Sequence, residues 1–314
     1  MPTILQAESL VKKYADFTAV DGISFEINEG EIFSLLGPNG AGKTTTISML
    51  STLIAPSSGD ARIGGHSVLH DPMAVRRLIG VVPQDLALYE DLSARENLNF
   101  WGQMYGLSGK ELKKRVDEVL EATGMTEKAN QRVKTYSGGM KRRINIGVGL
   151  LHQPRLLFMD EPTVGIDPQS RRSILDSVKA LNAQGMTVLY TTHYMEEAQE
   201  LSNRVGIIDH GKLIALGTQA ELTRQVGETD TLILHVGEEE TLDALIAALR
   251  SLPGVQKCDR TDHTIAVITP SAEEILAPVI TKANEIGVKI RSVDIEEPNL
   301  ESVFLNLTGR ALRD

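Results

Sequence analysis

The first feature of this sequence with chemical potential is a run of eight residues that combines three glycines, a lysine and a threonine. It begins at Gly37, ends at Thr44 and fits the pattern G-x-x-x-x-G-K-[ST]. Glycines let successive backbone N–H groups turn inward around phosphate oxygens. Lys43 can reach the β- and γ-phosphates, and the Thr44 hydroxyl can ligate Mg²⁺. We therefore expect a nucleoside triphosphate to bind consecutive residues: Gly37, Pro38, Asn39, Gly40, Ala41, Gly42, Lys43, Thr44 and Thr45.

The segments on either side of this run are suited to position it. Ile32–Leu36 is a short apolar segment typical of a buried strand, and Thr44–Leu53 can form a helix. The N-terminus of such a helix adds the positive end of a dipole to the phosphate site. An ordinary glycine-rich turn is the alternative, and a strand before the loop with a helix after it disfavours that reading.

Two adjacent carboxylates offer a second piece of phosphate chemistry. Asp160 and Glu161 follow the apolar segment Leu156–Met159, which we expect to be a strand. Asp160 can hold Mg²⁺ through water, and Glu161 can polarise an attacking water. Without the glycine-lysine loop, an acidic pair in a turn at a strand end would be the better interpretation. With that loop present, we interpret the pair as catalytic.

Three further candidates are less specific. His193 follows the expected strand Val188–Thr191, where a histidine beside a nucleotide site can sense phosphate, although a lone histidine is usually structural. Tyr14 could stack on the nucleotide base or half-bury on a strand, and composition leaves these two interpretations even. The third candidate is the turn formed by Ser137, Gly138 and Gly139, which precedes an expected helix. By itself this turn is a weak signal, because such turns are common.

Length and composition limit the class of protein. A chain of 314 residues suggests about two domains. The formal net charge of −10 disfavours unassisted binding to nucleic acid or anionic lipid. A single cysteine, Cys258, excludes an internal disulfide. Met1–Leu10 lacks the features of a signal peptide, and no apolar run approaches the about 20 residues that cross a bilayer. We expect a chain that is soluble or attached to a membrane through a partner.

A helical region separates the two halves of the expected site. The pattern is helical from Ser93 to Gly124, and Ser108 with Glu111 predicts a capping box. An apolar stripe on this region predicts a core contact, and it consists of Leu112, Val116, Val119 and Leu120. Four aromatic side chains also fall in or near it and can be core or a docking surface: Tyr89, Phe100, Trp101 and Tyr105.

The remainder of the chain has a different pattern. A polar linker begins at Gly227-Glu228, so we expect domains at residues 1–227 and 228–314. Strands and helices then follow in the order β-α-β-β-α-β, which is the ferredoxin-like order. This segment contains no glycine-rich loop, metal cluster, carboxylate pair with a base or RNA-binding aromatic motif. We interpret it as a regulatory or interface domain.

Taken together, the motifs between residues 4 and 226 resemble those of an ATP-binding cassette (ABC) transporter ATPase subunit. The resemblance implies an α/β P-loop ATPase domain with a helical subdomain, followed here by the small ferredoxin-like α+β domain. In the first half of this region, Tyr14 resembles the A-loop aromatic, Gly37–Thr45 the Walker A loop and Gln84 the Q-loop glutamine. In the second half, Ser137–Gly139 resembles the signature and Asp160-Glu161 the Walker B motif. Val164–Asp167 resembles the D-loop and His193 the switch histidine.

The same resemblance implies roles, cofactors and partners. ATP and Mg²⁺ are the expected cofactors, with Lys43, Gln84, Glu161 and His193 in catalysis and Thr44, Gln84 and Asp160 at the metal. Two ATPase subunits, expected to be copies of this chain, would face head to tail, with ATP between one Walker A loop and the other chain's signature. A separate integral-membrane permease would hold the ATPase at the cytoplasmic face of the cell membrane.

The end of the chain is similar to that of a narrower group. Glu297–Leu305 resembles the end of a C-terminal domain in drug and antibiotic exporter ATPases of the daunorubicin-resistance type, and the basic run Lys141–Arg143 is similar to their pattern. Many family members have glutamine where this chain has Met140, and methionine cannot make the hydrogen bonds of an amide. The resemblance therefore implies export of a hydrophobic compound and assigns no role to Met140.

Two alternatives remain. A soluble ABC ATPase acting on ribosomes or nucleic acid is disfavoured by the single Walker A loop, the absence of a long coiled-coil insertion and the acidic balance. A small-ligand sensor in the C-terminal domain that gates the ATPase is compatible with the exporter interpretation.

Overall fold

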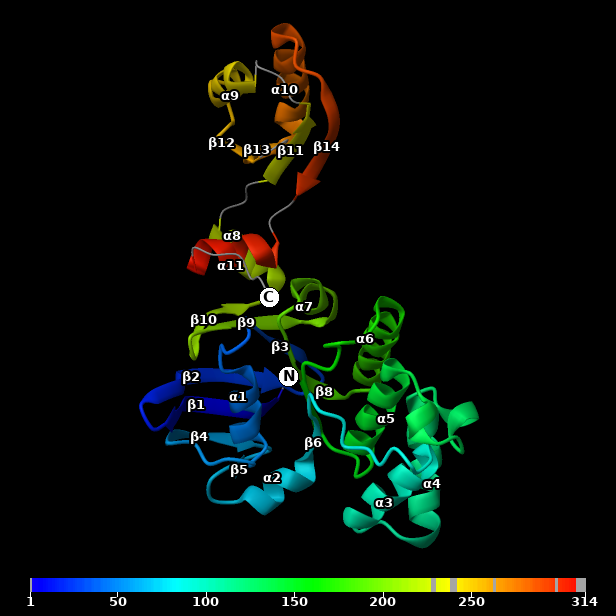
Figure 1. The fold of residues 1–314 in the computed structure, drawn as a ribbon. Helices are drawn as coiled ribbons and strands as arrows, with labels where there is room; N and C mark the ends of the chain where they lie inside the picture. Colours follow the sequence, from blue (N-terminus) through cyan, green and yellow to red (C-terminus); the bar gives the residue numbers. More distant parts are fainter. Residues whose placement is uncertain (1, 227–229, 238–241, 262–263, 297–298, 309–314) are drawn as a thin grey trace. The chain divides into compact units, whose positions relative to one another are not determined.

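The computed structural model describes residues 2–226, 230–237, 242–261, 264–296 and 299–308 (Figure 1). The chain divides into two compact units, one ending at Thr218 and the other beginning at Gln219. The linker expected at Gly227-Glu228 lies outside the described residues.

A six-stranded sheet forms the centre of the first unit. Its strands lie in the order β10-β9-β3-β8-β7-β6, and all neighbours are parallel except the antiparallel pair β9–β10. Every residue of β3, β7 and β8 is buried, as expected of parallel strands covered on both faces. The strands are β3 (Ile32–Leu36), β6 (Ile79–Val82), β7 (Leu156–Asp160), β8 (Thr187–Thr192), β9 (Arg204–Asp209) and β10 (Lys212–Gly217).

A second sheet of the first unit is antiparallel, in the order β2-β1-β4-β5. Its strands are β1 (Thr3–Tyr14), β2 (Phe17–Asn28), β4 (Ser58–Ile63) and β5 (His66–Ser67). Phe25 of this sheet stacks on Phe33 of the central sheet, with ring centroids 5.2 Å apart. The two sheets therefore share one apolar core, which holds the loop after β3 against both of them.

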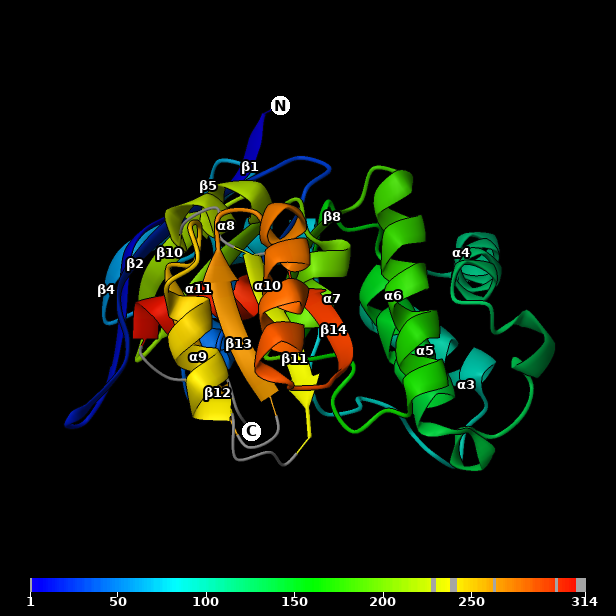
Figure 2. The ribbon, with the colours of Figure 1, turned by 90° about the horizontal axis from the view of Figure 1, so that it is seen from above.

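Most helices of the first unit gather beside the sheets, as α3 to α6 do in Figure 2. The predicted stripe on α4 is confirmed, since Leu112, Val116, Val119 and Leu120 are all buried. The helices are α1 (Lys43–Leu50), α2 (Pro72–Leu78), α3 (Ala94–Met104), α4 (Gly109–Ala122), α5 (Gly138–Leu150), α6 (Pro168–Ala183) and α7 (Met195–Leu201), with 3₁₀ turns at Thr126–Lys128 and Val133–Thr135.

The capping box predicted at Ser108 is wrong. The Ser108 side chain makes no capping hydrogen bond, and Gly109, the first residue of α4, has a left-handed φ of 56° that departs from helical geometry. A capping box occurs instead at α3, where the Ser93 and Glu96 side chains each accept from the other residue's backbone N–H.

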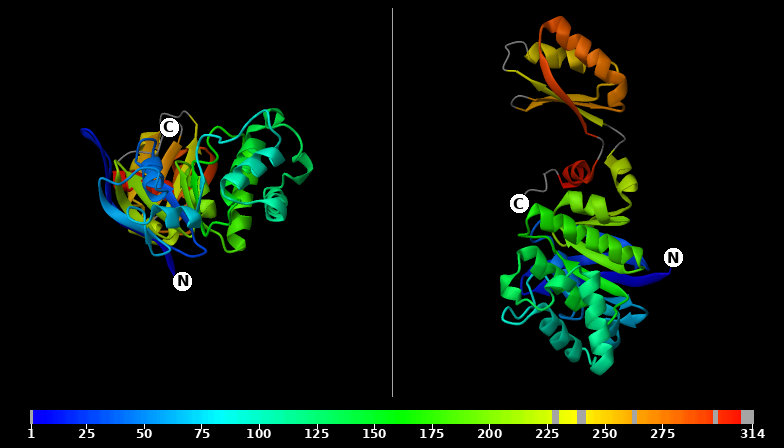
Figure 3. Two further views of the ribbon diagram at one scale, coloured as in Figure 1. Left: turned by 90° about the horizontal axis from the view of Figure 1, so that it is seen from below. Right: turned by 90° about the vertical axis from the view of Figure 1, so that its right-hand side faces the viewer.

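The second unit contains the predicted β-α-β-β-α-β order (Figure 3). Its sheet is antiparallel in the order β12-β13-β11-β14, which is the ferredoxin-like topology. Alternate residues of β11 and β13 are buried in one core with residues of α9 and α10. The elements are α8 (Gln219–Val226), β11 (Asp230–Val236), α9 (Leu242–Arg250), β12 (Lys257–Thr261), β13 (Thr264–Thr269), α10 (Ala272–Ile286), β14 (Ile290–Glu296) and α11 (Leu300–Thr308), the last packed on α8.

Among the described residues, none of the helices combines the length and apolarity needed to span a lipid bilayer.

Candidate functional site

The loop between β3 and α1 requires glycine at two positions. A Cβ on Gly37 would lie 2.2 Å from the Ile208 carbonyl oxygen, so the backbones touch there. Gly42 has a φ of 109°, and a Cβ would lie 2.6 Å from the Ala19 carbonyl oxygen. The loop therefore takes its shape from close contact with neighbouring backbone, and α1 begins directly after Gly42.

Lys43 places a buried cation inside this loop. Its side chain is only 4% exposed, and Nζ donates to the carbonyl oxygens of Gly37 at 2.7 Å and Pro38 at 3.0 Å. Nζ also lies 2.9 Å from Glu161 Oε1. The loop and the carboxylate at the end of β7 are thus joined by a charge-assisted hydrogen bond, although they are far apart in the sequence.

The acidic pair after β7 is held from the neighbouring strand β8. Thr191 Oγ1 donates to Asp160 Oδ1 at 2.7 Å and accepts from the Glu161 backbone N–H at 3.0 Å. Burial raises the pKa of Asp160, while hydrogen bonds from Thr191 and Thr44 oppose that shift. Glu161 has a φ of 43°, a left-handed conformation that is strained for a residue with a side chain.

His193 completes the group from the end of β8. Its Nδ1 lies 3.4 Å from Glu161 Oε2, and its ring lies against that of Tyr194 with centroids 4.1 Å apart and the ring planes tilted by 42°. The ends of β3, β7 and β8 thus bring Lys43, Glu161 and His193 together, at the carboxyl edge where open α/β sheets bind ligands.

An open cavity of about 330 Å³ lies over Lys43 and Glu161. It is lined by Phe17, Ala19, Asn39, Gly40, Gly42, Lys43, Thr44, Thr45, Gln84 and Glu161. Several predicted residues are not among its lining residues, namely Tyr14, Gly37, Pro38, Ala41, Ser137–Gly139, Asp160 and His193. Phe17, which the sequence reasoning missed, is 62% exposed and pairs with Tyr14 across the β1–β2 hairpin. The sequence did contain a signal for Phe17, because it lies three residues after Tyr14, across the turn between the two expected strands.

Gln84 reaches this cavity from a segment that α5 holds in place. Arg142 is 4% exposed and donates to the carbonyl oxygens of Pro83 at 2.8 Å and Gln84 at 2.6 Å. Asn145, one turn further along α5, accepts from the Ala87 backbone N–H at 3.0 Å. The position of Gln84 therefore depends on α5, the helix that carries the signature residues at its start.

Ser137, Gly138 and Gly139 form the N-terminus of α5. Ser137 is the N-cap and its hydroxyl accepts from the Met140 backbone N–H at 3.3 Å. A Cβ on Gly139 would lie 2.2 Å from Ser170 Oγ, so the close approach of α6 requires glycine there. The Met140 side chain packs against the apolar core of the first unit, which a glutamine amide would suit less well.

The donor atoms around the cavity suit Mg²⁺, which prefers oxygen ligands. The Thr44 hydroxyl hydrogen-bonds the Asp160 carboxylate, and Gln84 lines the same cavity. Within the described part of the chain, no group of three or more histidine, cysteine or acidic side chains is arranged to hold a metal. Thr44, Gln84 and Asp160 would hold Mg²⁺ through their oxygen atoms.

Comparisons with known proteins agree with this geometry. Residues 20–164 match the family described as ABC transporter. The chain is 50% identical to the linearmycin resistance ATP-binding protein LnrL of Bacillus subtilis, covering 99% of this chain and 100% of that protein. It is 38% identical to the daunorubicin resistance ATP-binding protein DrrA3 of Streptomyces coeruleorubidus, over 98% of this chain and 96% of that protein.

A solved ATP-binding cassette shares the fold of the first unit. It is a dimer in a post-hydrolysis state with bound ADP and phosphate, 27% identical, with a TM-score of 0.61 over 68% of this chain and 98% of that one. Three findings lead to one conclusion: the glycine-lysine loop, the acidic pair at the end of β7, and the likeness to LnrL and DrrA3 over nearly the whole chain. The chain belongs to the ABC transporter family, as a nucleotide-binding, ATP-hydrolysing subunit related to the export and drug-resistance ATPases.

Proposed function

We propose that this chain powers the export of a hydrophobic compound, such as a drug, an antibiotic or a lipid-like molecule, through a separate membrane permease. The observation that carries the catalytic part is the cluster of Lys43, Glu161 and His193, in which Lys43 and Glu161 line one cavity and His193 contacts Glu161. The export part is supported by the two relatives reported above, which are named for resistance to linearmycin and to daunorubicin. The permease would place the chain at the cytoplasmic face of the cell membrane.

In the proposed mechanism, ATP enters with its phosphates in the loop after β3. The Lys43 ammonium, which contacts Glu161, would move its hydrogen bonds to the phosphate oxygens. Glu161 is then free to polarise the attacking water, with His193 beside it to contact the γ-phosphate. Mg²⁺, held by Thr44, Gln84 and Asp160, would neutralise phosphate charge. Tyr14 is proposed to stack on adenine, with Phe17 next to it.

A second ATPase subunit, proposed to be another copy of this chain, would complete the site. Facing the first head to tail, it would present Ser137–Gly139 to the nucleotide. The signature forms the N-terminus of the 13-residue helix α5, where backbone N–H groups and the helix dipole favour an anion. The dimeric relative with ADP and phosphate supports this arrangement.

Glu161→Gln tests the catalytic assignment. An amide cannot polarise water as a carboxylate does, so turnover should fall by about 10²- to 10⁴-fold while ATP binding persists. ATP should then hold the variant as a long-lived dimer, detectable by size-exclusion chromatography. Glu196→Gln, an exposed carboxylate on α7, is the matched control. A Glu161→Gln protein that hydrolyses ATP at the normal rate would contradict the mechanism.

The permease is proposed to dock on the segment Gln84–Tyr105. Tyr89 and Phe100 are 48% and 36% exposed and pack edge to face, with centroids 5.0 Å apart. Trp101 instead packs against the core and donates from Nε1 to the Ala87 carbonyl oxygen. Exposed aromatic side chains are common anchors for an inserted helix.

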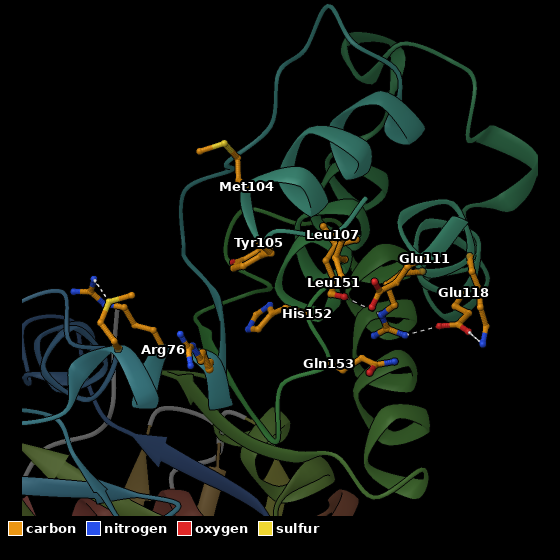
Figure 4. Close-up of a pocket in the computed structure, with 13 residues that line it drawn as sticks. Arg76, Met104, Tyr105, Leu107, Glu111, Glu118, Leu151, His152 and Gln153 are labelled. Atoms are coloured by element: carbon orange, nitrogen blue, oxygen red, sulfur yellow. Dashed lines mark hydrogen bonds and ion pairs between the residues drawn. The ribbon is translucent and has the colours of Figure 1, made fainter. Parts of the chain in front are cut away.

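An open groove of about 610 Å³ continues this surface. Figure 4 shows Tyr105 and His152 in its middle, with Arg76 from α2 on one side and Glu111 and Glu118 from α4 on the other. Its apolar lining includes Met73, Met104, Tyr105, Leu107 and Leu151, and its basic lining consists of Arg76, Arg77, Lys114 and Arg115. Glu118 pairs with both Lys114 and Arg115, so these two cations already have an acidic partner. An occupant with apolar side chains and a carboxylate would therefore complement the two arginines of α2.

Tyr89→Ala tests the docking surface. We expect normal ATPase activity in the isolated protein and weaker co-purification with the permease. Leu53→Ala is the control, because Leu53 is an exposed apolar side chain on a different segment. Unfolding of Tyr89→Ala, or unchanged complex formation and transport, would refute the assignment.

The proposal for residues 228–314 is a regulatory or interface role. Its ferredoxin-like sheet carries a separate core, and the described part of that segment has no metal cluster. Loss of dimerisation or transport on its removal, with ATP binding intact, would support this role.

A further inference from the structure

A buried carboxylate that the proposed mechanism does not use lies directly behind the catalytic groups. Glu197, in α7, is 2% exposed. It accepts hydrogen bonds from Thr163 Oγ1 at 2.6 Å, Tyr190 Oη at 2.9 Å and Thr192 Oγ1 at 2.9 Å. Burying a carboxylate is unfavourable unless it is well hydrogen-bonded, so this group needs its partners.

The three hydroxyl donors come from both strands that carry catalytic groups. Thr163 lies two residues after Glu161, in a turn closed by a bond from the Val164 N–H to the Glu161 carbonyl oxygen. Tyr190 and Thr192 flank Thr191, which bonds Asp160 and the Glu161 backbone. Burial and the Glu197 carboxylate raise the pKa of Tyr190 well above its usual value, so its hydroxyl stays protonated and able to donate.

A cation links the same carboxylate to the histidine segment. Arg171 Nε lies 3.6 Å from Glu197 Oε1, and the guanidinium lies over the Tyr194 ring, 4.2 Å from its centroid. The other neighbour of that ring is His193. Arg171 belongs to the first turn of α6, which begins directly after the segment matched to the D-loop, Val164–Asp167. Glu197 thus connects the turn after Glu161, the end of β8 and the start of α6.

The backbone of Glu161 explains why such a connection is needed. A left-handed φ in a residue with a side chain persists only where the surroundings enforce it. Thr191 holds the Glu161 backbone N–H, and Glu197 holds the turn on its other side through Thr163. We propose that Glu197 is a positioning residue that keeps Glu161 and His193 in one geometry for hydrolysis. This inference rests on the catalytic roles proposed above for Glu161 and His193.

Glu197→Gln is the first test, because it keeps the size of the side chain and removes its charge. We expect kcat to fall roughly 10- to 100-fold, as for a small misplacement of catalytic groups. The Kd for ATP, measured with labelled ATP, should stay within about threefold, since the loop after β3 is not part of this network. Glu196→Gln, the exposed neighbour, should retain the wild-type rate.

A second pair of variants keeps the proposal testable if Glu197→Gln folds poorly. Thr163→Val removes one donor at nearly constant volume and should lower kcat, whereas Thr163→Ser keeps the hydroxyl and should restore most of the rate. Combined with Glu197→Gln, the valine variant should add less loss than it does alone, because both changes act on the same hydrogen bond between residues 163 and 197.

His193→Ala, measured in parallel, separates two kinds of failure. If it retains the wild-type rate, the proposed role of His193 fails. If it is inactive while Glu197→Gln and Thr163→Val keep the wild-type kcat, only the positioning role is overturned. Equal loss of activity in Thr163→Ser and Thr163→Val would also overturn it, because the hydroxyl would then be irrelevant.

Discussion

The contact between Lys43 and Glu161 makes a quantitative prediction about the stability of the first unit and its affinity for ATP. Both side chains are nearly buried, at 4% and 7% exposure. Lys43→Met removes the cation and leaves the Glu161 carboxylate beside His193 without its closest partner. The variant should therefore lose both stability and affinity for ATP, and the two losses have different physical origins.

The expected magnitudes follow from these contacts. Removing one partner of a buried ion pair lowers the free energy of unfolding by about 3–5 kcal/mol. Loss of a charged hydrogen bond to phosphate weakens binding by about 1.5–3 kcal/mol, or roughly 10- to 150-fold in Kd. In the double variant Lys43→Met with Glu161→Gln, no unpaired carboxylate remains, so much of the lost stability should return.

The chain offers a convenient assay, because Trp101 is its only tryptophan and lies in the first unit. Urea unfolding followed by tryptophan fluorescence therefore reports the ATPase unit separately from the ferredoxin-like unit. The wild type, the two single variants and the double variant form one cycle of stability. The same four proteins form a second cycle with the Kd for labelled ATP.

Two results would refute this reasoning. Additive effects on stability would mean that the Lys43–Glu161 contact contributes nothing to the folded state. The second cycle, measured with the Kd for ATP, makes a separate prediction. Glu161→Gln frees the Lys43 ammonium from a competing carboxylate. Lys43→Met should therefore weaken ATP binding more in the Glu161→Gln protein than in the wild type. Wild-type affinity in the Lys43→Met protein would remove the loop after β3 from ATP binding altogether.

Three further predictions concern other parts of the chain. Tyr14→Ala should weaken ATP binding by about 1–3 kcal/mol, while Tyr14→Phe should not. A similar loss in Phe17→Ala would show that both rings contact the base. An equal loss in both Tyr14 variants would indicate that the tyrosine hydroxyl has a structural role. Chains 1–218 and 1–227 should both fold and bind labelled ATP, and insolubility of the shorter one alone would favour the boundary predicted from the sequence. Burial lowers the pKa of His152. Below about pH 6.5 the unfolded chain therefore binds a proton at this histidine that the folded chain does not, and the free energy of unfolding of the wild type falls as the pH falls. The His152→Gln variant should lose less of its free energy of unfolding between pH 7 and pH 5 than the wild type does.

The sequence predicted the parts of the site that depend on local patterns. Short apolar segments indicated β3, β6, β7 and β8, and residues at or just after the ends of these strands supply part of the cavity lining and the groups proposed for catalysis. This works because residues that follow parallel strands meet at one edge of the sheet. The ferredoxin-like order was also readable, since each of its elements has its own periodicity.

The parts that were missed depend on contacts between distant segments. Phe17 lines the cavity only because the β1–β2 hairpin lies beside the loop after β3. Arg142 belongs to a run of three basic residues, which from sequence alone is typical of a solvated helix face, yet it is buried against Pro83 and Gln84. No local pattern distinguishes it from Lys141 or Arg143.

The contacts of Glu161 bear on the order of events that we propose for the ATPase cycle. Glu161 is engaged by Lys43 and lies near His193. In the proposed mechanism the phosphates compete with this carboxylate for the ammonium, so Glu161 would gain its role as the base when ATP takes that contact. The backbone of Glu161 need not move for that exchange, because Thr191 holds it from β8.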